Sequence, residues 1–139
     1  MQDGTIFSPG YAQGTSGGRG NVYASDCPTR QLLDRVGDKW SVLVLLLLGE
    51  EDIRFNSLKR RISGVSQKML SQTLRSLERD GLITREVQVS APVTVTYGIT
   101  ALGRDLLAAL RMMIDWAETH MPDVVLAQHQ YDTRKGVEA

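Results

Sequence analysis

The chain has 139 residues and a mass of 15.4 kDa, and its 42% hydrophobic and 23% charged residues are ordinary for one compact domain. This size excludes a large multidomain enzyme. The longest apolar run, Val42 to Leu48, is far shorter than the roughly 20 residues of a membrane-spanning helix, and the N-terminus lacks the basic and apolar regions of a signal peptide. We therefore expect a soluble, cytoplasmic protein.

Charge is distributed unevenly along this chain, although its formal net charge is zero. Residues 54 to 85 carry eight basic and two acidic side chains, a net charge of +6, which leaves −6 for the remaining residues. If the basic side chains share one face, they form an electrostatic footprint for phosphate groups.

The first 25 residues contain six of the thirteen glycines, so this segment cannot bury enough surface to offset its ordering entropy. We expect a flexible tail over residues 1–25. Its stretch Gly17 to Gly20 lacks the Gly-Lys-Ser/Thr ending of a phosphate-binding loop. The single cysteine, Cys27, permits no internal disulfide and no structural zinc site, although it could pair across a dimer. The histidines His120 and His129 lack further ligands at metal spacing, so no metal and no cofactor is expected.

Two helices are predicted before residue 50. The first begins near Ser25 or Asp26, tolerates Pro28 in its first turn and ends at Gly37. Its apolar residues Leu32, Leu33 and Val36 are expected to be buried. Asp38 then caps a second helix that is apolar nearly all round and should be the central core element. Periodicity alone leaves a buried strand open for residues 42–48.

After Gly49 the pattern indicates a helix-turn-helix. Residues 55–62 form a short amphipathic helix, residues 63–65 a turn, and Ser66 caps a second helix over 67–80 that ends at Gly81. The apolar residues of this second helix recur at helical spacing, which leaves a polar face with few acids. Its expected buried residues are Met69, Leu70, Leu74 and Leu77.

A β-hairpin and a long helix complete the domain. Residues 82–89 and 93–99 are rich in β-branched side chains, and Ser90, Ala91 and Pro92 supply the turn between them. Thr100 caps a final helix that should stop near Met121 and Pro122. The predicted fold is mainly α with a β-hairpin wing (α+β): a winged helix-turn-helix over residues 26–121, followed by a helix end and tail over residues 122–139.

The chain resembles the HxlR family of bacterial transcriptional regulators over residues 27 to 120. The resemblance is carried by the order and spacing of short motifs: Cys27-Pro28, Gly37-Asp38-Lys39-Trp40, Arg54-Phe55 with Leu58, Val65-Ser66-Gln67-Lys68-Met69-Leu70, Leu74 with Leu77-Glu78, Asp80-Gly81-Leu82, Tyr97 with Thr100, and Leu102-Gly103-Arg104. One departure is informative. The family usually has Arg or Lys after the prolines of the wing, whereas this chain reads Pro92-Val93-Thr94-Val95, so its wing tip should hold phosphates weakly.

The second helix of the helix-turn-helix is the expected reader of the DNA major groove. Gln72 and Arg75 are the candidates for base contacts, because Gln pairs bidentately with adenine and Arg with guanine. Residues near the helix N-terminus are better placed for phosphates or the first base: Ser66, Gln67, Lys68 and Ser71. Further backbone contacts are predicted for Arg54, Lys59 and Arg85. Alternatively, these side chains form a solvated helix face, and Arg79 and Arg85 pair with Glu78 and Glu86.

Cys27 is a candidate effector site. A helix N-terminus and the nearby Arg30 favour the thiolate, whereas Asp26 opposes it. The resemblance implies sensing of oxidants or small electrophiles, because several HxlR-type regulators use a cysteine at the corresponding place. The alternative is a buried, inert cysteine that packs as a small apolar residue.

The leading hypothesis is a regulator, not an enzyme, that binds double-stranded DNA as a homodimer on a pseudo-palindromic operator. The first and last helices should form the dimer interface, with Leu106, Leu110, Met113 and Trp116 contributing from the last. Two alternatives remain: a winged-helix module that binds another protein, and a regulator induced by a non-covalent small ligand. A catalytic set of nucleophile and base is not found in the sequence.

Overall fold

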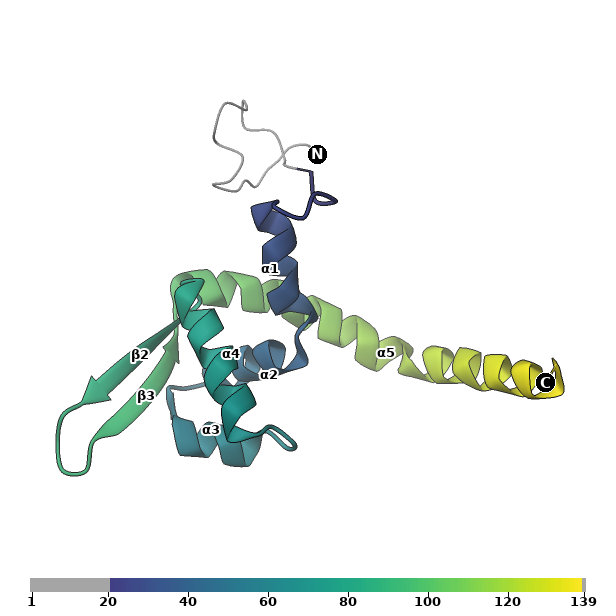
Figure 1. Cartoon of the computed structure of the whole chain (residues 1–139). Helices are drawn as coiled ribbons and strands as arrows, with labels where there is room; N and C mark the ends of the chain where they lie inside the picture. The colour runs from purple at the N-terminus through teal and green to yellow at the C-terminus, as the bar shows by residue number, and fades with distance from the viewer. Residues whose placement is uncertain (1–20, 139) are drawn as a thin grey trace.

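The computed structural model describes residues 21–138, which fold as a body of helices with a small three-stranded sheet at one side (Figure 1). The predicted tail lies almost wholly outside these residues. Figure 1 shows a hairpin that projects from one side of the helical body and a last helix that extends beyond the other side. The elements in chain order are α1 (Pro28–Gly37), α2 (Lys39–Leu48), β1 (Ile53–Arg54), α3 (Phe55–Arg61), α4 (Gln67–Arg79), β2 (Ile83–Gln88), β3 (Thr94–Ile99) and α5 (Ala101–Glu138).

The core is built around α2, which is a helix and not a strand. Its start is fixed by Asp38, whose carboxylate accepts the N–H of Trp40 (3.4 Å) and the hydroxyl of Ser41 (2.9 Å). Val44 and Leu48 are fully buried, and the surrounding core includes Leu58, Leu70, Leu74, Leu77 and Leu107. The expectation of a central apolar helix is therefore confirmed.

The helix-turn-helix forms as predicted, from α3 and α4. Ser66 caps α4, since its hydroxyl accepts the N–H of Met69 at 3.1 Å. At the other end, Gly81 adopts a positive φ of 80° and the N–H of Leu82 donates to the carbonyl of Leu77, the pattern of a Schellman motif. The prediction that Met69 is buried is wrong: it is 40% exposed, because it lies at the edge of the apolar face.

Three antiparallel strands, in the order β1-β3-β2, make up the sheet. The hairpin pairs Ile83 with Ile99 at its base and Gln88 with Thr94 near its tip. Strand β1, which pairs Ile53 with Tyr97, was not expected, because two residues are too short for an alternating pattern. It ties the start of α3 to the wing and so fixes the two relative to each other.

Helix α1 differs from its prediction in where it begins and in which of its residues are buried. It begins at Pro28 with Cys27 as the N-cap residue, later than Ser25 or Asp26. No residue within it is buried, and Leu32 and Leu33 are 41% and 52% exposed. The expected burial of these leucines is wrong for the single chain, because α1 packs beside α2 and lies outside the core.

Helix α5 is much longer than predicted. It passes through Pro122 and continues to Glu138, a rise of about 57 Å at 1.5 Å per residue. A proline removes one N–H donor, and the carbonyl it leaves, that of Glu118, lies on an exposed part of the helix where water can bond it. The predicted stop at Met121 and Pro122 is therefore wrong. None of the helices within residues 21–138 is both long enough and apolar enough to cross a membrane.

Only some of the residues predicted for the dimer interface are available on this chain's surface. Met113 and Trp116 are 52% and 59% exposed, and the Trp116 ring stacks on His120 with centroids 4.5 Å apart. Leu106 is half-buried against the core. Leu110 is 1% exposed inside the chain's own core, so its assignment to a dimer interface is corrected. Leu110 lies one helical turn after Leu106 on the same apolar stripe. This spacing is the same for a residue of the chain's own core and for a residue of a dimer interface, so the sequence could not separate the two.

Candidate nucleic-acid interface

Helix α4 has one face in the core and one in solvent. Leu70, Leu74 and Leu77 are buried, whereas Gln67, Lys68, Gln72 and Arg75 are exposed. The exposed face contains no acidic residue before Glu78. It can therefore approach a polyanion along its first two turns.

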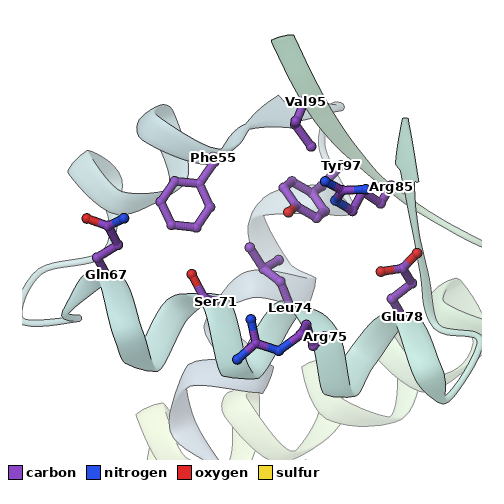
Figure 2. Close-up of a pocket in the computed structure, with 9 residues that line it drawn as sticks. All are labelled: Phe55, Gln67, Ser71, Leu74, Arg75, Glu78, Arg85, Val95 and Tyr97. Carbon is purple, nitrogen blue, oxygen red and sulfur yellow. The ribbon is translucent and has the colours of Figure 1, made fainter. Parts of the chain in front are cut away.

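A cleft of about 540 Å³ separates α4 from the wing (Figure 2). Gln67, Ser71 and Arg75 line it from α4, and Arg85 lines it from β2. Figure 2 shows these side chains around one concave surface, with the ring of Phe55 closing it on the α3 side. Four of the predicted DNA-binding residues, from the consecutive elements α4 and β2, thus share one site.

A second cleft, of about 560 Å³, lies between the start of α3 and the wing. Arg54 lines it together with Arg60, and the opposite wall is formed by the wing residues Pro92 to Val95. This wall has no charged side chain, and Val93 is 61% exposed. The basic groups of the second cleft therefore come from β1 and α3, and the wing adds none.

Four other predicted site residues lie outside both clefts. Lys68, Gln72 and Lys59 are exposed, and the 100° step between helical residues directs Lys68 and Gln72 away from the core, beside Arg75. The hydroxyl of Ser66 caps α4. Ser66 therefore has a structural role as the cap of α4, while a DNA contact by Ser66 stays a prediction.

The ion pairs leave the basic face largely uncompensated. Within residues 21–138, side-chain pairs closer than 4 Å join Arg35 to Asp80 and Arg61 to Glu50 and Glu51. The suggested pairs of Arg79 with Glu78 and of Arg85 with Glu86 are not among these pairs. Arg75, Arg79 and Arg85 therefore present their charge to solvent.

Five residues that line the first cleft were not among the predicted site residues: Phe55, Leu74, Glu78, Val95 and Tyr97. Glu78 follows Ser71 and Arg75 at helical spacing, which could have identified it as a neighbour on the same face. Phe55 carried no such signal, because its place depends on how α3 packs against α4 and β3.

The candidate effector residue lies apart from both clefts. Cys27 is the N-cap residue of α1, its backbone N–H donates to the carbonyl of Ala24 at 3.1 Å, and its side chain is buried, with the residue 5% exposed. The predicted neighbour Arg30 donates to the carbonyl of Tyr23 at 2.7 Å. Across residues 21–138 no group of three His, Cys, Asp or Glu side chains is placed to hold a metal ion.

The family of this chain is shown by a family model and by similar proteins. The model of the family described as HxlR-like helix-turn-helix matches residues 35–124. The uncharacterised HTH-type transcriptional regulator YtfH of Escherichia coli (strain K12) is 39% identical over 111 residues, which cover 80% of this chain and 88% of YtfH.

Solved structures of similar proteins have the same architecture as this chain. The transcriptional regulator ytfH from Salmonella typhimurium has a TM-score of 0.73 and 40% identity, and the match covers 80% of this chain and 98% of that one. The redox regulator HypR in its oxidized form has a TM-score of 0.62 and 35% identity, covering 67% of this chain and 96% of HypR. These proteins are named as regulators, not enzymes, and the predicted winged helix-turn-helix class is confirmed.

Proposed function

The chain belongs to the HxlR-like helix-turn-helix family and is a transcriptional regulator, and from this premise we propose that it binds one DNA sequence specifically, as a homodimer on a pseudo-palindromic operator. The observation that carries the proposal is the exposed face of α4. Its polar side chains share a cleft with Arg85 of the wing, and no ion pair within 4 Å holds Arg75 or Arg85 in residues 21–138.

Helix α4 would enter the major groove with its N-terminal half. Gln72 and Arg75 are exposed on this face and would contact base edges, Gln through its amide and Arg through its paired N–H groups. Ser66, Gln67, Lys68 and Ser71 would lie near the phosphates that border the groove. Lys59, Arg54 and Arg85 would contact the backbone on either side.

A second copy of the chain would cover the apolar side chains that a single copy exposes. Leu32 and Leu33 of α1 and Met113 and Trp116 of α5 are each at least 41% exposed, and Leu106 of α5 is half-buried. Exposed apolar side chains in such numbers on two helices are typical of an interface. A two-fold dimer would present two α4 helices to successive half-sites, about one duplex turn apart.

Cys27 is the proposed effector site, which oxidants or small electrophiles would modify. Two observations support this assignment: Cys27 begins α1, one of the helices proposed for the dimer, and HypR, which matches this chain, is named as a redox regulator. Because Cys27 is buried, modification requires local opening at the start of α1, and we expect it to be slower than for an exposed thiol.

The DNA proposal is tested by selecting duplexes from a random-sequence pool with the purified chain at several salt concentrations. We expect one two-fold-related sequence to be enriched and its affinity to fall steeply with salt. If all duplexes are retained equally, the chain lacks sequence specificity. If none is retained, the winged helix serves as a protein-binding module instead.

The effector proposal is tested by treating the reduced chain with diamide or a quinone and measuring affinity for the selected duplex, with thiol titration to confirm modification. The wild type should change its affinity, and Cys27→Ser should not. A modified wild type that binds DNA as before would make Cys27 a structural residue. The remaining candidate would then be a non-covalent small-molecule effector.

A further inference from the structure

Besides its buried face, α4 is attached to the rest of the molecule at its C-terminal end. Asp80, Gly81 and Leu82, which we call the α4 end segment, close the Schellman motif and lead into β2. Figure 1 shows the end of α4, the base of the hairpin and the start of α5 meeting at one corner of the molecule. A contact on this segment therefore acts on the orientation of α4.

Helix α5 holds the α4 end segment from one side. The hydroxyl of Thr100 donates to the carbonyl of Gly81 at 2.7 Å and accepts the N–H of Gly103 at 3.0 Å, while the backbone N–H of Thr100 donates to the carbonyl of Leu82 at 3.1 Å. A Cβ added to Gly103 would overlap the Leu82 carbonyl, so the first turn of α5 packs directly on this backbone. The α4 end segment and α5 therefore move together.

Helix α1 holds the same segment from the other direction. The guanidinium Nε of Arg35, in the last turn of α1, donates to Oδ2 of Asp80 at 2.5 Å, and both side chains are largely shielded, at 23% and 19% exposed. Low exposure limits screening by water and salt, so this pair is stronger than a surface pair. Helix α1 also packs on α2, with Val36 against the core, and the ion pair adds a direct link from α1 to the end of α4.

We propose that Arg35 is a positioning residue for DNA recognition: through Asp80 it sets the angle between α1 and α4, and thereby the separation and rotation of the two reading helices in the dimer. The inference rests on the proposed dimer and its operator. Arg35 and Asp80 contact no base in this scheme. Their effect is on which spacing of half-sites the dimer accepts.

The physical basis is that two rigidly held helices can match only one half-site spacing. Changing the separation by one base pair rotates one half-site by about 34° around the duplex axis and moves it by about 3.4 Å, since about 10.5 base pairs make one turn. A dimer whose α4 helices are fixed by both α1 and α5 loses contacts at one half-site. Without the ion pair, α1 can turn against the body that holds α4, so the α4 helices of a dimer can follow the displaced half-site.

The experiment uses the full-length chain and the duplex that the wild type selects from a random-sequence pool, together with versions whose half-sites are one base pair closer or further apart. For the wild type we expect affinity to fall about tenfold or more on either side. For Arg35→Gln we expect less than about a threefold fall, with the preferred half-site sequence unchanged. Asp80→Asn should act in the same way.

Two further variants separate positioning from general stability. Arg30→Gln removes an arginine from the same helix, where its guanidinium donates to the nearby carbonyl of Tyr23, and it should keep the wild-type spacing preference. The exchange of Arg35→Asp with Asp80→Arg should restore that preference. Thermal unfolding and sedimentation of each variant, run in parallel, show whether it is folded and dimeric.

The outcomes distinguish this inference from the proposed function. If the wild type selects no sequence, the proposed function fails and the inference with it. If the wild type has a sharp spacing preference and folded, dimeric Arg35→Gln keeps it, the inference alone is overturned. A uniform loss of affinity at all spacings, without broadening, would likewise reduce the ion pair to a structural contact.

Discussion

Two glycines in helices of this chain have opposite surroundings. A methyl group at Gly103 would overlap the carbonyl oxygen of Leu82 and approach the side chain of Ile99 at 2.7 Å. A methyl group at Gly37, in the last turn of α1, would meet nothing within 4 Å. The first glycine is required by packing, and the second is not.

We therefore expect Gly103→Ala to lower the free energy of unfolding by about 1–3 kcal/mol, since backbone atoms must move to admit the methyl group. Gly37→Ala should leave it unchanged or raise it by up to about 1 kcal/mol, because alanine restricts the unfolded chain. Urea unfolding at one fixed protein concentration provides the comparison. Equal stability of the two variants would contradict the close packing of α5 on the α4 end segment.

Arg75 and Lys68 lie on the same exposed face of α4, and truncating each side chain to alanine should change DNA binding in a different way. Arg75→Ala is expected to cost about 1–3 kcal/mol on the selected duplex and to relax preference at one base position. Lys68→Ala should weaken binding to selected and random duplexes alike and flatten the slope of log affinity against log salt by about one. Binding titrations of each variant on the selected and random duplexes, at several salt concentrations, measure these differences. If Arg75→Ala affects both duplexes equally, it is a phosphate contact.

At the scale of elements, the wing is the part whose chemistry departs from the family. Its tip and returning strand carry no basic side chain between Glu86 and Thr100, although Val93 is well exposed beside the cleft that Arg54 lines. The chain therefore depends on α3, α4 and β2 for contacts with phosphates.

Adding a charge to this tip should strengthen DNA binding. We expect Val93→Arg to raise affinity for random duplexes and to steepen the salt slope by about one, as for one added phosphate contact. Gln128→Arg, which adds the same charge to an exposed site on the outer part of α5, is the matched control and should change neither. If both variants gain equally, net charge and not the wing is responsible.

The first part of helix α5 packs in the core of the chain, and its next turns are predicted to contact a second subunit. Truncation after Gly103 would remove Leu107 and Leu110 from the core, so it would unfold the chain and report nothing about the interface. Met113→Glu combined with Trp116→Glu is the sharper test, because both side chains are exposed.

This double variant should remain folded by circular dichroism and sediment as a monomer, since two carboxylates would have to be buried without partners in the interface. Met112→Glu, on a neighbouring residue that is 74% exposed, tests whether the effect is specific to the predicted side. A folded double variant that still sediments as a dimer would place the interface elsewhere.

For the whole molecule, the +6 charge of residues 54–85 matters because the fold gathers much of it around α4 and the wing. A dimer doubles this surface. The salt slope of the wild type on its selected duplex should thus be about twice that of the monomeric double variant, in proportion to the phosphates neutralised. A monomer with the wild-type slope would mean that one subunit makes all the phosphate contacts.

The sequence by itself determined the elements whose signals are local. Helix ends are marked through hydrogen bonds within a few residues at Asp38, Ser66, Gly81 and Thr100. The helical spacing of the leucines on α4 sets which face of that helix is buried. Such features depend on residues that are close in the sequence, so they can be inferred without knowing the rest of the fold. The exposed polar face of α4 followed from the same pattern.

The tertiary structure decided what depends on partners distant in the chain. An apolar stripe has the same sequence whether it faces a core or a second subunit, so only packing could show that Leu110 is buried while Leu32 and Leu33 are exposed. The end of α5 was misjudged because a proline stops a helix only where its lost hydrogen bond goes unsatisfied. The cleft that brings Phe55 and Tyr97 to α4, and the pairing of Arg35 with Asp80, join residues that are separated along the chain, and no local pattern encodes such a meeting.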